Sequence, residues 1–575
     1  MAARPSANRA PIDFLPEALK VVAWRASSGV RSWVRSTWAY RRLLAGPLPD
    51  HIVYHPIDTM PRRLDDAEAL LRGRFKFQGE TVDAGDRSIF DQLAPSPEWA
   101  EALHGFTWLA PLSAAGGEAA KTLATNLVSQ WLKRNGKYSE PAWLPHVTAR
   151  RLIAMFAHGR FILTNADMLW RSKVYVSLRE QSRLLARILG EAPEGLPRIE
   201  AAAALALSGL CLDDGPKRLE VGLAHLENEL ARQILPDGGH LSRSPEALVQ
   251  VYRCVVMVME VLTAVGYAVP PGLRTAHDRM APMIRFFRHG DGALALFNGG
   301  GEANAKMVHA LLHRDDVKGQ PFGYARHSGY HRLHAGRTLV LFDCGAAPVG
   351  AFSTAAHAGC LAFELSAGVH RIIVNCGCAA LAAHRMWQPA LRATAAHSTA
   401  TVADTSSAII VRDGWMKRVL GARIVHGPEA IETRRIETEK GNIVVASHDG
   451  YGPQFGIRHE RELTLSPHGL ALTGIDRLLP RQDRKQALNY AVRFHVHPDV
   501  RLSRAESGYV LLKLPNGEGW RFRATQPVAV EESVYVGGEA IRRTEQLVVT
   551  GQVKNEPVEI GWIIEQIGTG TPPAS

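Results

Sequence analysis

The spacing of apolar residues changes once along this 575-residue chain, near Pro321. Before that point, apolar residues recur at intervals of three and four, as in Ala120, Leu123 and Leu127, which is typical of amphipathic helices. Proline or glycine separates one such segment from the next. We expect an all-α first half, with helices over residues 117–135, 145–158, 168–191, 197–211, 216–234, 245–265 and 273–288.

Runs of β-branched and alternating apolar residues follow Pro321, with turn residues at short spacing between them. The runs cover residues 338–342, 409–411, 443–447, 463–465, 491–497, 509–514, 546–549 and 559–564. This pattern is typical of a large antiparallel β-sandwich. The sequence therefore predicts a multidomain α+β protein, although periodicity alone leaves open how the helices are arranged.

The composition narrows the range of partners. The net charge of +11 suits nucleic acid, anionic lipid or an acidic polysaccharide equally well. No zinc-finger, phosphate-loop or RNA-recognition pattern is present, so we expect no nucleic-acid partner. We see no secretory signal and no run of about 18 apolar residues, so a cytoplasmic protein without a transmembrane helix is expected. The six cysteines lack C-x-x-C spacing, which favours reduced thiols.

The first 60 residues form a basic arm in which Trp24, Trp33 and Trp38 lie among arginines. One interpretation is an amphipathic helix that touches an anionic membrane as a peripheral contact. The alternative is a helix that packs its tryptophan side on the helical half or on a partner. At the other end, the Gly/Thr/Pro-rich residues 568–575 are expected to be disordered.

Two histidines and an asparagine mark a candidate site in the β-rich half. His357 precedes a strand-like run, Asn375 closes the next strand, and His397 opens a third. If these strand ends converge, three ligands and an open position would suit a divalent metal such as zinc. The simpler interpretation is that a single histidine near a strand end is hydrogen-bonded and half-buried.

Three motifs carry a resemblance to a known family. HAGCLAFEL begins at His357, RATAAHST begins at Arg392, and DGGHLSRSP begins at Asp237. Their order and content resemble the heparinase II/III family of polysaccharide lyases. The resemblance implies an incomplete (α/α) toroid over residues 61–320 and an antiparallel β-sandwich over residues 321–567, preceded by the arm over residues 1–60.

The resemblance also implies an activity, the β-elimination of an acidic, uronate-containing glycan in the cleft between the two domains. Such a lyase needs a base, an acid and a group that neutralises the substrate carboxylate. The family's metal positions correspond to His357, Asn375 and His397, and Asn375 replaces the usual aspartate. Structural zinc is therefore the implied cofactor, with one anionic ligand missing.

Three family positions are replaced by residues without acid–base chemistry: Leu196, Ala247 and Ala355. Nearby residues are candidate substitutes. His240 is the expected base because it lies near the start of a helix, whose dipole favours the neutral imidazole. The predicted catalytic set is His240, Tyr252 and Tyr330, and the predicted substrate-binding set is Arg243, His327, Arg385 and Trp387.

Each candidate has a second interpretation, in which its side chain only hydrogen-bonds a loop. Two alternative functions therefore stay open beside the lyase. One is a catalytically degenerate carbohydrate-binding protein of the same fold. The other is a glycoside hydrolase that uses carboxylates such as Asp237, Glu246 and Glu364, which requires two of them to face one cleft.

Overall fold

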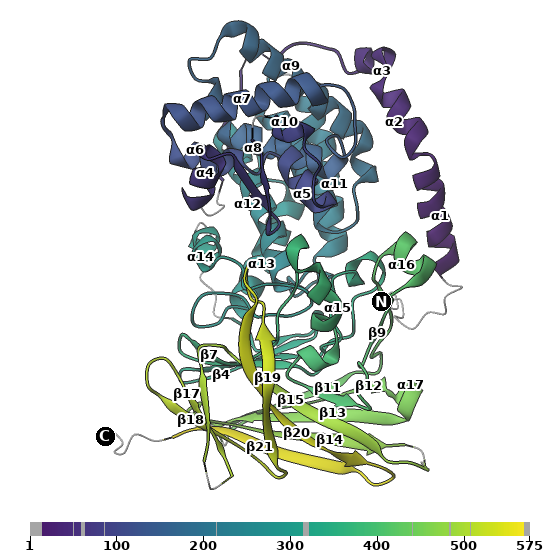
Figure 1. Cartoon of the computed structure of the whole chain (residues 1–575), viewed down its shortest axis with the longest axis vertical. Helices are drawn as coiled ribbons and strands as arrows, with labels where there is room; N and C mark the ends of the chain where they lie inside the picture. The colour runs from purple at the N-terminus through teal and green to yellow at the C-terminus, as the bar shows by residue number, and fades with distance from the viewer. Residues whose placement is uncertain are drawn as a thin grey trace.

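The computed structural model describes residues 14–49, 51–58, 64–85, 87–213, 215–313, 321–439, 441–481, 483, 485–505 and 508–567. The predicted disordered tail lies outside these residues. Figure 1 shows a helical domain stacked on a β-domain, with three N-terminal helices running along one side of both. The predicted succession of a helical toroid and an antiparallel β-sandwich is confirmed.

The helical domain closely follows the predicted segments. Two of them, α7 and α12, coincide with their predicted bounds, and the others differ by a few residues at their ends. The helices are α5 (Pro97–His104), α6 (Leu109–Ala115), α7 (Gly117–Asn135), α8 (Pro145–Leu163), α9 (Met168–Ile188), α10 (Leu196–Cys211), α11 (Pro216–Gln233), α12 (Pro245–Val265), α13 (Pro271–Phe286) and α14 (Ala305–His313).

The helical domain also contains a small β-element. Helix α4 (Leu64–Leu71) is followed by a two-stranded hairpin, β1 (Arg74–Phe77) and β2 (Glu80–Asp83). Phe75 is buried against the toroid, while its neighbours on the strand face solvent. The strands are too short for their alternation to stand out in the sequence.

Helix α10 forms the centre of the toroid core. Its alanines and leucines are buried on every side, and α8, α11 and α12 pack around it. Gly222 of α11 allows the closest approach, because a Cβ at this position would lie 2.4 Å from the backbone nitrogen of Ala206. Helix α12 is long and apolar enough to cross a membrane by length and composition, but most of its apolar side chains are buried in this core.

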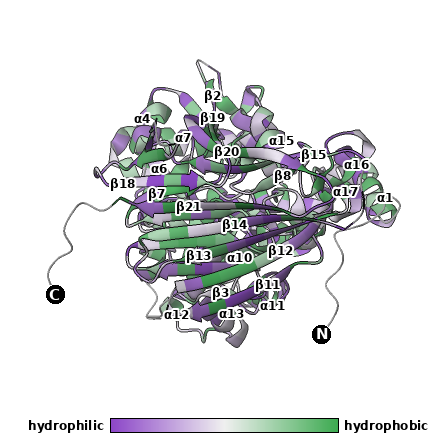
Figure 2. Ribbon diagram, turned by 90° about the horizontal axis from the view of Figure 1, so that it is seen from below, coloured by the Kyte–Doolittle hydropathy of each residue, from purple (hydrophilic) through white to green (hydrophobic). Residues whose placement is uncertain are grey.

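The β-domain consists of two antiparallel sheets. One has the order β11-β12-β13-β14-β21-β18-β17-β16, and the other has the order β19-β20-β15-β7-β6-β5-β4-β3, with β8 paired to β15. Buried and half-buried residues alternate along β13. Figure 2 shows hydrophilic and hydrophobic segments on the strands of the first sheet. Phe363, Phe494 and Trp562 pack between the two sheets.

The first sheet contains β11 (Glu432–Thr438), β12 (Gly441–Tyr451), β13 (Ile457–Leu465), β14 (Ala471–Pro480), β16 (Arg501–Arg504), β17 (Val510–Lys513), β18 (Gly519–Ala524) and β21 (Val558–Gln566). The second contains β3 (Tyr324–Ala325), β4 (Tyr330–Ala335), β5 (Thr338–Asp343), β6 (Phe363–Ala367), β7 (His370–Val374), β8 (Ala400–Val402), β15 (Leu488–Val496), β19 (Val528–Tyr535) and β20 (Arg542–Val553).

Short elements connect the strands of the β-domain. They are the 3-10 helices η4 (Gly350–Ser353), η5 (Ala382–Trp387) and η6 (Thr394–Ala396), helices α15 (Gln388–Leu391) and α16 (Gly414–Leu420), and the paired strands β9 (Ile409–Ile410) and β10 (Ile424–His426). The toroid hairpin reaches η5, where the Ala383 N–H donates to the Gln78 carbonyl. This contact links the two domains at one end of their junction.

The N-terminal arm also links the helical domain to the β-domain. Helix α1 (Leu15–Ala26) packs Phe14 and Ala18 against Leu420 of α16, whereas α2 (Ser28–Ser36) and α3 (Trp38–Leu43) lie against the toroid (Figure 1). Ion pairs from Arg35 to Glu191 and from Arg41 to Glu180 fix the toroid end. The arm therefore packs on both domains, but Trp24, Trp33 and Trp38 are exposed, so its tryptophan side does not pack on the helical half.

Candidate functional site at the domain junction

The two predicted imidazoles meet in the β-domain. His357 Nδ1 lies 3.1 Å from His397 Nε2, and both rings are buried. His397 Nδ1 donates to the Ala393 carbonyl at 2.8 Å, so its Nε2 carries the lone pair that faces His357. Burial lowers the pKa of His397 to about 4 and lowers that of His357 well below its ordinary value. Both rings are therefore neutral at pH 7.

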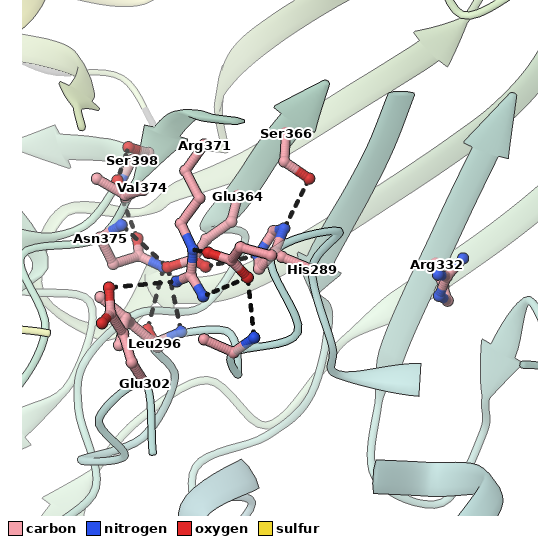
Figure 3. Close-up of polar contacts among 12 residues, drawn as sticks. His289, Leu296, Glu302, Arg332, Glu364, Ser366, Arg371, Val374, Asn375 and Ser398 are labelled. Atoms are coloured by element: carbon pink, nitrogen blue, oxygen red, sulfur yellow. Dashed lines mark hydrogen bonds and ion pairs between the residues drawn. The ribbon is translucent and has the colours of Figure 1, made fainter. Parts of the chain in front are cut away.

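Asn375 does not turn toward this pair. Its amide oxygen accepts the Ser398 N–H at 3.0 Å, and its amide nitrogen donates to the Leu296 carbonyl and to Glu364, as Figure 3 shows. Two imidazoles supply fewer than the three protein ligands typical of zinc. Within the described ranges, no group of three or more His, Cys, Asp or Glu side chains could hold a metal ion.

A buried carboxylate, Glu364, organises the region around Asn375. It accepts bonds from His289 Nε2 at 3.0 Å and from the backbone N–H groups of Leu296 and Asn375 (Figure 3). Burial would raise the pKa of Glu364, but the bond to His289 and the nearby Arg371 hold it below its usual value. These contacts tie strands β6 and β7 to the segment that leaves the toroid.

Arg243 and Tyr330 form the centre of the junction. Arg243 is buried, pairs with Asp343, and donates to the carbonyls of Ser328, Gly345 and Ala346. Its guanidinium lies 4.6 Å from the centre of the Tyr330 ring. The Tyr330 hydroxyl donates to the Arg243 carbonyl at 2.8 Å and accepts from the Asn298 amide. Both side chains are thus engaged in holding loops of the two domains together.

His240 also forms hydrogen bonds through both of its ring nitrogens. Its Nδ1 accepts the Ser242 N–H, so Nε2 carries the proton and donates to Gln233 Oε1 at 2.9 Å. Burial lowers the pKa of His240 to about 4. The ring is neutral, as predicted from its place near a helix start, although burial is the cause. Neither ring nitrogen offers a free lone pair to a substrate.

The remaining predicted residues lie in different places. The Tyr252 hydroxyl is within the toroid, 3.0 Å from His277 Nε2. His327 is exposed, and its backbone N–H donates to Asp237. Arg385 forms an exposed ion pair with Glu98 of the toroid at 2.6 Å, and the neighbouring Trp387 is 41% exposed. Arg385 and Trp387 both belong to the exposed 3-10 helix η5.

The three replaced family positions lie along the same junction. The Ala355 carbonyl lies beside Gly299, and Gly300 of the same loop lies against Ser244, which caps the helix that carries Ala247. At the start of α10, which begins at Leu196, the neighbouring Gly195 lies beside Phe352 of η4. The Phe352 ring also packs at 5.8 Å on His240. Small and apolar side chains therefore line the place where the family resemblance implies acid–base groups.

The carboxylates proposed for a hydrolase accept hydrogen bonds from the backbone of the protein. Asp237 accepts the N–H groups of His327 and Ser328, Glu246 accepts the Gly301 N–H, and Glu364 has the partners given above. Sequence reasoning missed Asn298, which joins Tyr330, Asp343 and the His357 N–H. Its position before three glycines indicated only a turn, so no chemical signal pointed to it.

The comparisons with known proteins agree with this architecture. A family model described as "Heparinase II/III-like, C-terminal" matches residues 317–563. FtsZ-localized protein C of Caulobacter vibrioides (strain NA1000 / CB15N) is 33% identical over 549 residues, which cover 92% of this chain and 93% of that protein. The chain belongs to the heparinase II/III-like family. The similarity to the Caulobacter protein extends over the toroid as well, because it covers nearly the whole length of both chains.

Solved structures of this family share the fold. A crystal structure of heparinase III aligns with a TM-score of 0.71 at 14% identity, over 96% of this chain and 92% of that chain. A mutant of the heparan sulfate lyase HepC from Pedobacter heparinus aligns with a TM-score of 0.62 at 15% identity, over 97% of this chain and 92% of that chain. At such low identity the likeness shows the fold, a polysaccharide-lyase toroid and sandwich, and leaves the activity to be argued from the site.

Proposed function

We propose that this protein is a non-catalytic member of the heparinase II/III-like family that acts as a binding protein at an FtsZ-associated membrane surface. The observation that carries the first part is the lining of the domain junction. Leu196, Ala247 and Ala355 stand where the family resemblance implies groups that move protons or neutralise a carboxylate. None of these side chains can do either.

The nearby candidates do not replace them. A base for β-elimination needs a lone pair directed at the substrate, but His240 accepts a bond at Nδ1 and donates at Nε2. Tyr330 has a buried hydroxyl whose pKa burial raises far above its usual range, and it is bonded on both sides. Catalysis through Tyr330 would require breaking contacts that hold the two domains together, and catalysis through His240 would require breaking its bonds to Gln233 and Ser242 within the toroid.

The proposed location rests on the relative and on the arm. The Caulobacter protein is named for its localisation with FtsZ, and we infer the same association for this chain. The outer face of the arm exposes large apolar side chains that no part of the described structure covers: Leu19, Val30, Trp33 and Trp38. Tryptophan on a basic amphipathic helix is typical of a segment that lies in a membrane interface.

A second candidate function is the predicted lyase on an acidic, uronate-containing glycan, or binding of such a glycan without cleavage. The observation that favours it is the retained His357–His397 pair, together with the exposed Trp387 and Arg385 of η5. An aromatic face and a guanidinium are groups that stack on a sugar ring and bind its carboxylate.

A product assay separates catalysis from its absence. β-Elimination creates a 4,5-unsaturated uronate that absorbs ultraviolet light, so a panel of polyuronates incubated with the protein at neutral pH should give no such absorbance. Product formation that disappears in His240→Ala would overturn the non-catalytic proposal and restore the predicted base. Glycan binding without product would favour the carbohydrate-binding alternative, and Trp387→Ala should then weaken it.

The proposed membrane contact of the arm is tested separately. The full chain should sediment with vesicles that contain an anionic phospholipid more than with vesicles of neutral lipid alone, and FtsZ filaments should sediment with the protein-coated vesicles. The double substitution Trp33→Ala and Trp38→Ala should reduce vesicle binding about tenfold or more, since each indole contributes buried apolar area. Trp387→Ala is the matched control, because it removes an exposed tryptophan elsewhere. Equal loss in both variants would reject the arm as the contact.

A further inference from the structure

A small cavity on the β-domain lies next to the segment that holds the His357–His397 pair, because Ala393, which lines the cavity, accepts the bond from His397 Nδ1. Its volume is about 240 Å³, and it opens between the α15 segment and the β9–α16 segment. Residues from one continuous stretch of sequence, between Gln388 and Ala422, form all of its walls. It is smaller than the roughly 300–1,000 Å³ of sites that hold drug-sized ligands, so it fits a small molecule or one end group of a larger one.

The lining combines an apolar floor with cationic groups. The apolar part is formed by Pro389, Ala393, Ala408, Ile410, Val411 and Ala422. Arg412 and Lys417 stand at the exposed rim, and within the described ranges neither side chain makes an ion pair or hydrogen bond. Asp413 is the one carboxylate in the lining, so the cations are in excess.

A third cation lies in the wall. Arg392 is 2% exposed and donates to three carbonyls, those of Ala356, Ser353 and Ala422, at 2.8, 2.9 and 2.8 Å. These bonds engage each of its three nitrogens but leave its charge without a carboxylate partner in the described part of the chain. Burial lowers its pKa to about 10, so the group is still charged at pH 7. A buried uncompensated cation makes the cavity attractive to an anion.

We propose that this cavity binds an aliphatic carboxylate, with the apolar chain against the alanine and isoleucine floor and the carboxylate between Arg412 and Lys417. Guanidinium and ammonium groups bind carboxylates through charge-assisted hydrogen bonds, and the apolar floor selects against small inorganic anions. The same chemistry is present in a free short-chain fatty acid and in the C-terminal residue of a protein that ends in an aliphatic side chain.

An anion bound in this cavity is connected to the domain junction through Arg392. Its bonds to Ser353 and Ala356 join the cavity wall to η4 and to the loop that carries His357. An anion in the cavity therefore interacts with the residue that fixes this loop. We expect the η4 segment, which carries Phe352 against His240, to become more protected from hydrogen exchange when the cavity is filled.

Calorimetric titration of the full chain tests the proposal. Hexanoate should bind, and hexanamide, which has the same carbon chain without the charge, should bind at least tenfold more weakly. The double substitution Arg412→Gln and Lys417→Gln should weaken hexanoate binding by at least tenfold. Arg418→Gln is the matched control, because it removes one charge from α16 outside the cavity lining and should leave binding unchanged.

A substitution that fills the cavity tests the proposal independently. Ala422→Leu fills the cavity from a half-buried position and should abolish hexanoate binding without altering the melting temperature. Equal binding of hexanoate and hexanamide, no measurable binding of hexanoate, or binding of inorganic phosphate in its place would overturn the proposal. To distinguish the two sources, a short peptide ending in leucine is compared with its C-terminal amide. Tighter binding of the free acid than of hexanoate assigns the site to a protein terminus, whereas binding of hexanoate alone assigns it to a free acid.

Discussion

Arg461 and Asp476 form a fully buried ion pair on neighbouring strands of the sandwich, with the Arg461 Nε and Nη2 atoms 2.8 and 3.0 Å from the two carboxylate oxygens. The Asp476 carboxylate also accepts from His459 Nε2 and Trp562 Nε1. The remaining Arg461 nitrogen donates to the carbonyls of Leu361 and Ser398. These two loops flank the histidine pair, so an interaction deep in the sandwich positions the candidate site.

The first prediction concerns this ion pair. Asp476→Asn leaves the Arg461 charge buried without its partner, and breaking a buried pair in this way costs about 3–5 kcal/mol of unfolding free energy. Denaturant unfolding of the variant should show that loss. Glu559→Gln, which breaks an exposed pair with Arg477, is the control and should cost less than about 1 kcal/mol. A loss of similar size in both variants would contradict the role assigned to burial.

The second prediction concerns metal. If zinc binds at the histidine pair, only His357 Nδ1 and His397 Nε2 among the predicted ligands face it, so the ion should be lost on dialysis against a chelator while the fold is retained. Metal analysis before and after His397→Ala measures its content. The same zinc content in the wild type and the variant would remove the pair as the ligand set.

The third prediction concerns pH. Burial lowers the pKa of His240 and His397 to about 4 and that of His495 to about 3, whereas an unfolded histidine titrates near 6.5. The unfolded chain therefore binds protons more readily, so the stability from these neutral rings is complete above pH 6.5 and is lost as the pH falls toward 4. Unfolding free energies measured from pH 7.5 to 4 should decrease over that window.

A variant checks the contribution of one ring. His240→Asn removes a buried titrating group, so its stability should fall less steeply between pH 6.5 and 4, by up to about 3 kcal/mol in total. Leu93→Asn, at an exposed position without a titrating group, should follow the wild-type slope. Parallel slopes for all three proteins would show that His240 is not a source of the pH dependence.

The fold was predictable because its signals are local. Helix α12 begins at a Ser244-Pro245 start and ends at Gly266, which adopts a left-handed conformation with φ of 85°, so its bounds follow from capping rules. The pairing of His357 with His397 was predictable from the motifs. The orientation of Asn375 was not, because it depends on Glu364 and on the backbone of Leu296, which is 79 residues away in the chain.

The roles of the catalytic candidates also could not be predicted from the sequence alone. Residue types near the DGGHLSRSP motif suggested a base and a carboxylate-binding arginine, and both residues do lie near the junction. Their partners decide what they can do: Arg243 faces Asp343 100 residues later, and His240 faces Gln233 on the preceding helix. A single sequence gives no sign of such long-range pairings, so it could not separate a structural arginine from one that binds substrate.

The last prediction concerns the arm as a link between the domains. Ala18 of α1 is buried against Leu420, whereas the adjacent Leu19 is 66% exposed. Ala18→Asp places a carboxylate in this contact and should release α1 from α16, while Leu19→Asp adds the same charge on the outer face and should leave the contact intact. Because α2 and α3 are held separately by the toroid, neither change should unfold the two domains. Limited digestion with trypsin should therefore cut at Arg25 about tenfold faster in Ala18→Asp than in Leu19→Asp, with melting temperatures of the two variants within a few degrees of each other. Equal cleavage rates in the two variants would show that the packing of Ala18 does not hold the arm to the β-domain.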